Sequence, residues 1–266
     1  MDCSDKKKSV VIGVSLLLLI MFVSPSFAQQ LPHLPYGMTF VYEVQDEDAD
    51  HGRIILEFGW PCYEERTNVY YLQVIWEEQQ STWNQWSARQ RTVIDLDTLV
   101  PLIYHQQEKT ADTAYSICFV FDRSQQRVLF YEDEGGPKEL VWIKQWDLDF
   151  LSVLCRIISN ENCPEAPGVV NLLARGDMWY AEDGPSILNL PVGTYLASSI
   201  RLEGNQGTET IWVCGEERRP LQFELSTPWR KYTARLVSFS QRQMQYRTIL
   251  ERAGKDESKV PVGHWR

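Results

Sequence analysis

The sequence predicts a mainly β protein: a single domain with a strongly curved antiparallel meander, half-barrel or barrel-like, and one amphipathic helix packed on it. Two observations support this prediction. Apolar and polar residues alternate with a period of two in many short runs, which turn-forming residues separate. Helical spacing of apolar residues occurs in a single segment. A chain of 266 residues, 44% of them hydrophobic, can build a substantial core, which excludes disorder for most of its length.

Residues 1–28 have the pattern of a secretory signal peptide. Three lysines at 6–8 precede a Leu/Ile/Val-rich run over 10–23, and Ser26 and Ala28 place small residues at the −3 and −1 positions of a cleavage site. We expect cleavage after Ala28 and a periplasmic location, with an uncleaved membrane anchor as the alternative. Elsewhere no apolar run reaches the length that spans a membrane, so we expect no transmembrane segment in the mature chain.

Most of the mature chain is predicted to form strands. The run with Leu221, Phe223 and Leu225 on one face and polar residues on the other is typical. Turn signals such as the glycines at 135–136 and the GNQG stretch at 204–207 separate the runs. The predicted strands are 39–44, 53–58, 69–76, 85–95, 102–108, 115–121, 127–131, 195–202, 208–214, 221–226 and 232–239.

The predicted helix begins at Leu148, with apolar residues at 148, 151, 154, 157 and 158. Asp147 stands at the expected N-cap, and Asp149 lies in the first turn, where negative charge suits the helix dipole. Residues 164–168 are predicted to link two parts of the sheet. Neither part has enough strands for its own core, so we expect one β-rich domain over 29–250 and a polar, loosely ordered tail over 251–266.

The mature chain would keep five cysteines, and an odd number leaves at least one thiol unpaired or bonded to another chain. Cys155 and Cys163 are the candidates for a disulfide, because they are closest in sequence and export permits the bond. Cys118 and Cys214 lie in apolar runs and are interpreted as buried small side chains. We expect no metal site, since the four histidines are scattered and no CxxC motif occurs.

Two groups of residues are candidates for contact with a ligand or partner. Trp83 and Trp86 lie in a polar stretch, where they would stack on sugar rings, form an interface, or fold back onto the sheet. Trp212, Arg218 and Arg219 come together at a strand exit; they would bind an anion, or else serve as core tryptophan and structural ion pairs. The formal net charge of −10 is unfavourable for nucleic acid, which we do not expect as a partner.

Catalysis has few candidates. Asp147 and Asp149 would form a carboxylate pair for acid–base chemistry, but capping a helix accounts for both. His105 and Glu108 are three residues apart in a predicted strand and should point to opposite faces. We therefore expect a protein that is not an enzyme and has no cofactor.

The order of several short motifs resembles a bacterial exported family known as domain of unknown function 3108. The motifs are LPVGTY at 190–195, TIWV at 210–213, ERRPL at 217–221, TARL at 233–236, DTLVPL at 97–102, FD at 121–122 with RV at 127–128, and DLDFLS at 147–152. The likeness covers residues 36–240. It departs where Arg219 meets Pro220 directly, at Cys214, and in the tryptophan-rich stretch 76–87. The resemblance implies an envelope protein with a strongly curved sheet and no established catalytic role.

Together these observations predict an exported envelope protein that binds or carries an apolar or amphipathic ligand, such as a lipid or glycan, without catalysis. The first alternative is a structural or assembly factor that contacts an envelope protein through a sheet edge or the Trp83/Trp86 stretch. The second is a hydrolase of envelope polymers that uses Asp147, Asp149 or His105. A concave face completely filled by the protein's own side chains would count against ligand binding.

Overall fold

The computed structural model describes residues 31–46, 51–64, 69–80, 87–122, 124–132, 138–142, 147–160, 167–172, 176–215, 218–228 and 231–242. The described residues from Pro32 onward belong to one compact unit. The predicted signal peptide over 1–28 and the tail over 251–266 lie outside the described residues, as do Trp83, Trp86 and Cys163.

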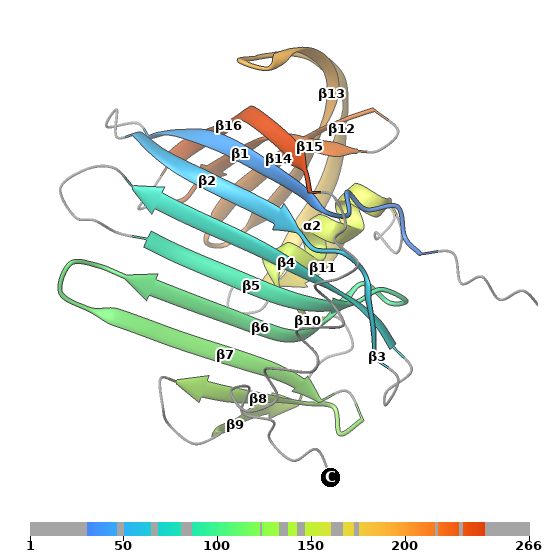
Figure 1. The fold of residues 1–266 in the computed structure, drawn as a ribbon, viewed down its shortest axis with the longest axis vertical. Coiled ribbons are helices and arrows are strands. Elements are labelled where there is room, and N and C mark those ends of the chain that lie inside the picture. The colour runs from blue at the N-terminus through green and yellow to red at the C-terminus, as the bar shows by residue number, and fades with distance from the viewer. Residues whose placement is uncertain are drawn as a thin grey trace, which may run out of the picture. The chain divides into compact units, whose positions relative to one another are not determined.

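The described strands form one 16-stranded sheet (Figure 1). Its strands are β1 (Met38–Asp46), β2 (His51–Phe58), β3 (Cys62–Glu64), β4 (Val69–Gln80), β5 (Ser87–Asp95), β6 (Val100–Lys109), β7 (Ala114–Asp122), β8 (Arg127–Glu132), β9 (Lys138–Trp142), β10 (Asp147–Leu148), β11 (Gly168–Leu172), β12 (Gly176–Leu190), β13 (Gly193–Gly204), β14 (Gly207–Cys214), β15 (Arg219–Ser226) and β16 (Lys231–Gln241).

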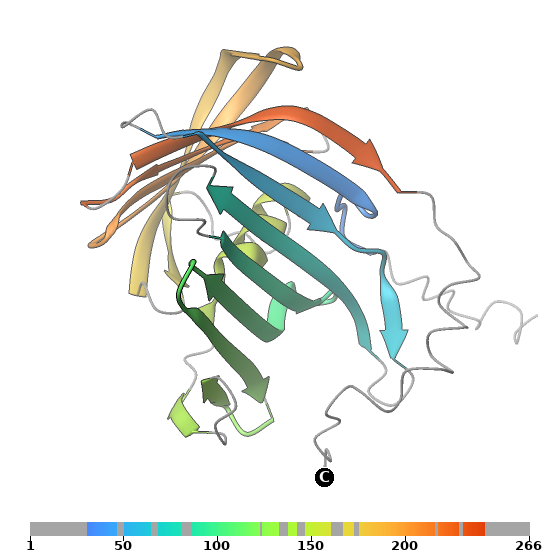
Figure 2. The ribbon, with the colours of Figure 1, turned by 60° about the vertical axis from the view of Figure 1, so that its left-hand side comes forward.

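The strand order is β10-β11-β12-β13-β14-β15-β16-β1-β2-β4-β5-β6-β7-β8-β9, with β3 paired to β4 outside this path. All pairings are antiparallel except that of β10 with β11. The first strand, β1, therefore joins the two halves of the sheet, because it pairs with β16 on one side and β2 on the other. The edge strands are β9 and β10, which follow each other in sequence. Because these two edges do not pair with each other, the curled sheet is open (Figure 2). This confirms the predicted barrel-like antiparallel meander.

The core lies on the inner face of the curl. Alternate residues of neighbouring strands meet there in register: Phe40 pairs with Leu56, and Leu56 pairs with Trp76. All three side chains are buried, whereas the intervening Glu43 and Arg53 are exposed. Period-two alternation therefore produces one dry and one wet face across the sheet.

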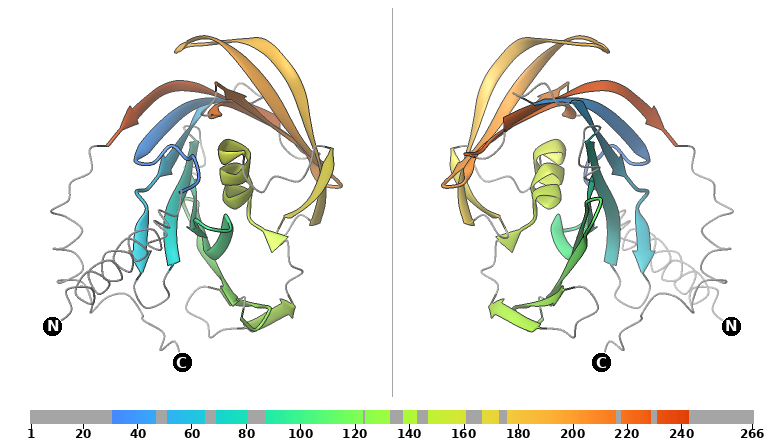
Figure 3. Two further views of the ribbon diagram at one scale, coloured as in Figure 1. Left: turned by 90° about the vertical axis from the view of Figure 1, so that its right-hand side faces the viewer. Right: turned by 90° about the vertical axis from the view of Figure 1, so that its left-hand side faces the viewer.

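The helix α2 (Phe150–Ser159) packs within the curl, under the arch of the sheet (Figure 3). Its residues from Leu151 to Ser159 are all buried. The predicted N-cap was wrong by two residues. Asp149 is the cap and accepts hydrogen bonds from the backbone N–H groups of Leu151 and Ser152, whereas Asp147 belongs to β10. Leu148 is a strand residue paired with Leu172, a long-range contact that sequence spacing does not reveal.

The sequence prediction missed five strands: β3, β9, β10, β11 and β12. The longest is β12, whose middle contains Gly184 and Pro185, which are typical of turns. The structure accommodates them in a register shift between Asp183 and Ser186, where β12 pairs with β13. Among the described residues, no helix is both long enough and apolar enough to cross a bilayer, and α2 has only 10 residues.

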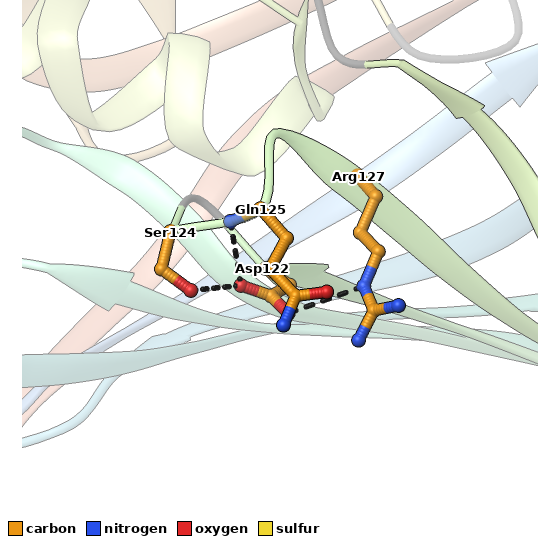
Figure 4. A network of polar contacts seen from close by, with 4 residues as sticks. All are labelled: Asp122, Ser124, Gln125 and Arg127. Atoms are coloured by element: carbon orange, nitrogen blue, oxygen red, sulfur yellow. Dashed lines mark hydrogen bonds and ion pairs between the residues drawn. The ribbon is translucent and has the colours of Figure 1, made fainter.

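The turn between β7 and β8 is organised by Asp122 (Figure 4). Its Oδ1 accepts hydrogen bonds from the Ser124 hydroxyl at 2.6 Å and the Gln125 backbone N–H at 3.1 Å, and its Oδ2 accepts one from Arg127 Nε at 3.2 Å. The Ser124 hydrogen bond, with help from Gln125 and Arg127, lowers the pKa of Asp122. The folded state therefore favours the ionised carboxylate.

We expect Asp122→Ala to destabilise the protein by about 1 kcal/mol at pH 7, because the hydrogen bonds of the turn are lost. A depressed carboxyl pKa contributes stability that is present above the unfolded-state value of about 4 and disappears as the pH falls through the folded-state value. Urea unfolding at pH 7 and at pH 2.5 measures the difference between variant and wild type. A difference that does not shrink at low pH would contradict this role for the charge.

Candidate functional site

The inner face of the curl contains a cavity of about 390 Å³ next to the first residues of α2. Side chains of β4, β5, β6 and β7 line one side of it, and β14, β15 and β16 contribute the other. Its volume falls within the range of small-molecule sites, about 300–1,000 Å³. The helix therefore fills only part of the curl.

Strand alternation explains the composition of the first wall. Glu78, Ala88 and Glu108 form one cross-strand row, because Ala88 pairs with Glu78 of β4 and with Glu108 of β6. Trp76 and Gln90 belong to the next row. Residues of both rows line the cavity. Deeper along β4, the inward positions become entirely apolar and buried, so this wall passes from an apolar core to polar strand ends.

Aromatic rings form the contact between the two walls and the helix. The Trp76 and Phe223 ring centroids lie 4.9 Å apart with an interplanar angle of 85°, and those of Trp76 and Phe150 lie 5.7 Å apart at 88°. Phe223 comes from β15 and Phe150 is the first residue of α2. Edge-to-face rings of this kind pack stably and expose ring faces or edges to the space beside them.

A ladder of side-chain hydrogen bonds follows β6 along the cavity. The Tyr104 hydroxyl donates to Gln106 Oε1 at 2.6 Å, and Gln106 Nε2 donates to Glu108 Oε1 at 2.6 Å. The three residues are two apart, so they share the inward face of the strand. The ladder therefore positions the Glu108 carboxylate at the polar end of the wall.

Asp149 borders the cavity but serves the fold. It is buried, and its carboxylate accepts from the Leu151 and Ser152 backbone N–H groups, from Ser152 Oγ at 2.7 Å and from Thr92 Oγ1 at 2.8 Å. Burial raises the pKa of Asp149 despite these hydrogen bonds, which favour the charged form. A carboxylate held by four donors fits helix capping, which is the structural interpretation offered above for this residue.

The predicted anion-binding residues do not converge on the cavity. Trp212 Nε1 donates to Glu224 Oε1 at 3.2 Å on the face opposite Ile211, which lines the cavity. Arg218 Nε donates to the Ile157 carbonyl at 2.7 Å, and its guanidinium pairs with Glu182 at 3.1 Å, so it ties the end of α2 to β12. The Arg219 guanidinium lies 4.6 Å from the centroid of the Phe239 ring. Each of the three residues thus has a contact within the sheet or helix.

His105 and Glu108 point to opposite faces, as predicted. The His105 ring contacts Ser116 Oγ at 2.9 Å through Nε2, whereas Glu108 lines the cavity. Burial, with smaller effects of Arg91 and Arg89, lowers the pKa of His105. His105 is therefore not positioned to act together with Asp149.

The described cysteines are Cys62, Cys118, Cys155 and Cys214, and no disulfide joins any two of them. Cys155 is fully buried in α2, where burial and the charge of Asp149 raise the pKa of its thiol well above the usual value. Its predicted partner, Cys163, lies outside the described residues, so the disulfide stays a prediction. Among the described residues, no three His, Cys, Asp or Glu side chains are grouped to hold a metal ion.

Sequence reasoning did not identify the cavity residues as a site. Trp76, Gln90, Gln106 and Phe223 were part of ordinary strand patterns, and Phe150 widened a helical stripe. The available signal was the polar residue at an inward position near a strand end, as at Glu78. That signal becomes informative only once the inward face is known.

No family model matches the chain, and no curated protein matches it. Among solved structures, it is similar to a β-barrel-like protein of domain of unknown function DUF1849 from Brucella abortus, with a TM-score of 0.55 and 7% identity over 80% of this chain and 99% of that chain. A putative lipoprotein from Parabacteroides distasonis aligns with a TM-score of 0.37 and 8% identity over 79% of this chain and 99% of that chain. The first likeness shows the barrel-like fold alone.

Proposed function

We propose that this protein is an exported, non-catalytic binding protein that holds an amphipathic ligand in the cavity inside its curled sheet. The observation that carries the proposal is the cavity of about 390 Å³ that remains beside α2 on the concave face. Clefts and cavities inside curved sheets and barrels are frequent ligand sites. Export rests on the signal-peptide pattern over residues 1–28, which supports a periplasmic location.

The lining favours an amphipathic ligand over a purely apolar one. Trp76, Phe119 and Phe223 supply an apolar surface, and Gln90 and Gln106 supply amide groups beside it. A hydrocarbon placed against the Gln90 amide would remove it from water without replacing its hydrogen bonds to water, which is unfavourable. A ligand with an apolar body and a polar end matches both parts.

A binding role is favoured over hydrolysis by the use of Asp149. The carboxylate that the sequence offered for acid–base chemistry caps α2 and is held by four donors. A general acid or base must have its carboxyl oxygen within hydrogen-bond distance of the substrate atom that gives or takes the proton. The donors around Asp149 come from the helix and from Thr92 instead.

Filling the cavity tests the proposal. Ala88 lines the cavity and is buried, so Ala88→Phe places a ring into the space. We expect native mass spectrometry of the wild type, purified from a Gram-negative host without detergent, to show a reproducible adduct that Ala88→Phe lacks. The matched control is Ala114→Phe, at an exposed position of β7 outside the cavity.

The adduct should persist in the Ala114→Phe control. A wild-type chain with only its bare mass would contradict the proposal, and so would an adduct that remains in a folded Ala88→Phe variant. Thermal unfolding of both variants shows that each is folded.

A further inference from the structure

The hairpin of β12 and β13 extends beyond the rest of the sheet as a two-stranded arm (Figure 1). The pairing of β12 with β11 ends at Tyr180, and the pairing of β13 with β14 ends at Ala197. Residues 187–190 pair with residues 193–196, and neither segment pairs with another described strand. We call residues 187–196 the arm; none of them is buried.

The arm presents apolar side chains on both faces. Ile187 and Leu196 are directly paired across it, so their side chains lie next to each other on one face. They are 72% and 65% exposed, the largest fractions among the exposed large hydrophobic side chains of the described residues. Leu188 pairs with Tyr195 on the opposite face, where both are half-buried. A strand that only covers a core needs apolar residues on one face.

The arm also differs from the rest of the chain in charge. Residues 184–200 contain no charged side chain, although 23% of the whole chain is charged. Charges resume at the base of the arm, where Glu182 pairs with Arg218 at 3.1 Å and Asp183 Oδ2 accepts from the Ser199 hydroxyl at 3.5 Å. An uncharged arm suits an electrically neutral, apolar surroundings, and the charged base has to stay in water.

Polar side chains at the tip of the arm have partners within the arm. The Thr194 hydroxyl donates to Asn189 Oδ1 at 2.8 Å, and the Tyr195 hydroxyl donates to the Val192 carbonyl at 3.2 Å. Removing these groups from water therefore costs less than removing unbonded ones. The outer edges of the two strands have no ladder partner, and such edges do not occur exposed to hydrocarbon, so the arm suits the interfacial layer of a bilayer and not its centre.

We propose that the arm inserts into the interfacial layer of a neutral lipid bilayer, with Ile187 and Leu196 against the acyl chains and the charged base in water. A bilayer surrounds a projecting arm on both faces, whereas a groove in a protein covers one. A second copy of this chain fits less well, because a standard interface buries about 800 Å² per partner and two side chains supply a small part of that. The inference goes beyond the proposed function, since no arm residue lines the cavity.

Sedimentation with lipid vesicles tests the proposal on the protein purified from an exporting host. We expect the wild type to bind vesicles of phosphatidylcholine, and its affinity to stay the same when salt is raised from about 0.1 M to about 0.5 M, because the arm carries no charge. Adding phosphatidylglycerol should weaken binding at low salt, because the formal net charge of the chain is −10 and these lipids are anionic.

Serine variants assign the binding to the arm. Ile187→Ser and Leu196→Ser should each weaken binding to phosphatidylcholine vesicles about fivefold or more, whereas Ile187→Leu should retain it. The matched control is Val169→Ser, which removes a side chain that is 56% exposed on β11, outside the arm. All variants share residues 1–28, so any contribution of that segment to vesicle binding cancels in the comparison. Thermal unfolding shows that each variant is folded.

Several results would overturn the proposal. They are a wild type that does not bind vesicles, serine variants that bind as tightly as the wild type, and a Val169→Ser control that is weakened equally. Sedimentation velocity adds another: self-association that Ile187→Ser abolishes, without vesicle binding, would make the arm an interface between copies. Ala88→Phe, which fills the cavity, should bind vesicles like the wild type. Loss of vesicle binding in that variant would assign the lipid contact to the cavity and not to the arm.

Discussion

Replacing Asp149 with alanine should destabilise the protein by about 3 kcal/mol, which makes it one of the most damaging single changes in the chain. Loss of an N-cap costs about 0.5–2 kcal/mol, and each buried donor left without its acceptor costs about 1–3 kcal/mol, with incomplete additivity. Here the donors are the hydroxyls of Thr92 and Ser152 and the first N–H groups of α2. Urea unfolding at pH 7 measures the loss.

Asp149→Asn is the matched control. Its amide oxygen can accept from the Leu151 and Ser152 N–H groups, so we expect a loss of about 1 kcal/mol or less, as asparagine is an equally good cap. The comparison also has a pH dependence. Burial raises the pKa of Asp149, so the folded state binds its proton more tightly than the unfolded state does.

The sign of that dependence follows from proton linkage. With a raised folded-state pKa, wild-type stability declines as the pH rises from the unfolded value of about 4 through the folded value, and is constant above it. The asparagine variant lacks this decline, so its deficit relative to wild type should be greatest at low pH. A deficit that grows with pH, or an alanine variant as stable as wild type, would refute the role assigned to Asp149.

The fold class could be predicted because its signal is local. In β1, Phe40, Tyr42 and Val44 alternate with polar or half-exposed residues, and such alternation survives whatever the strand pairs with. The strands that were missed depend on partners. β10 has two residues, and only its pairing with β11 makes it a strand. The helix start was predicted two residues too early for the same reason. Leu148 fits the apolar spacing of the helix, but its pairing with Leu172 makes it a strand residue.

The candidate site was less predictable because its defining property is nonlocal. Glu78 and Glu77 are adjacent glutamates of β4, yet only Glu78 is buried and lines the cavity. Nothing in the two residues distinguishes them: the curl of the sheet decides which face is inside. Glu209 lines the same cavity as Glu78 because the curl of the sheet brings β14 opposite β4, although the two residues are more than a hundred positions apart in the sequence. Of the residues that stood out in the sequence, Trp212, Arg218 and Arg219 have intramolecular contacts instead.

Arg156→Ala should cost about 3 kcal/mol, by removing the attachment of the last turn of α2 to the β5–β6 turn. Arg156 is 6% exposed; its Nε donates to the Leu99 carbonyl at 3.3 Å, and a terminal nitrogen donates to the Thr98 carbonyl at 3.2 Å. Leu99 is fully buried with a φ of 52°, an unfavourable conformation for leucine that its surroundings must maintain. Truncation would leave both carbonyls without this donor, and the positive charge near the helix C-terminus would also be lost.

Arg156→Lys separates the geometry of the guanidinium from its charge. The lysine keeps the positive charge at the helix end, but one ammonium group cannot reproduce the two directed hydrogen bonds of the arginine fork. We therefore expect a loss of about half that of alanine, measured by urea unfolding at pH 7. If lysine restores full stability, charge at the helix terminus is sufficient and the two carbonyl contacts are incidental. If alanine costs less than about 1 kcal/mol, an ordinary surface contribution, other contacts hold the Leu99 turn in its strained conformation.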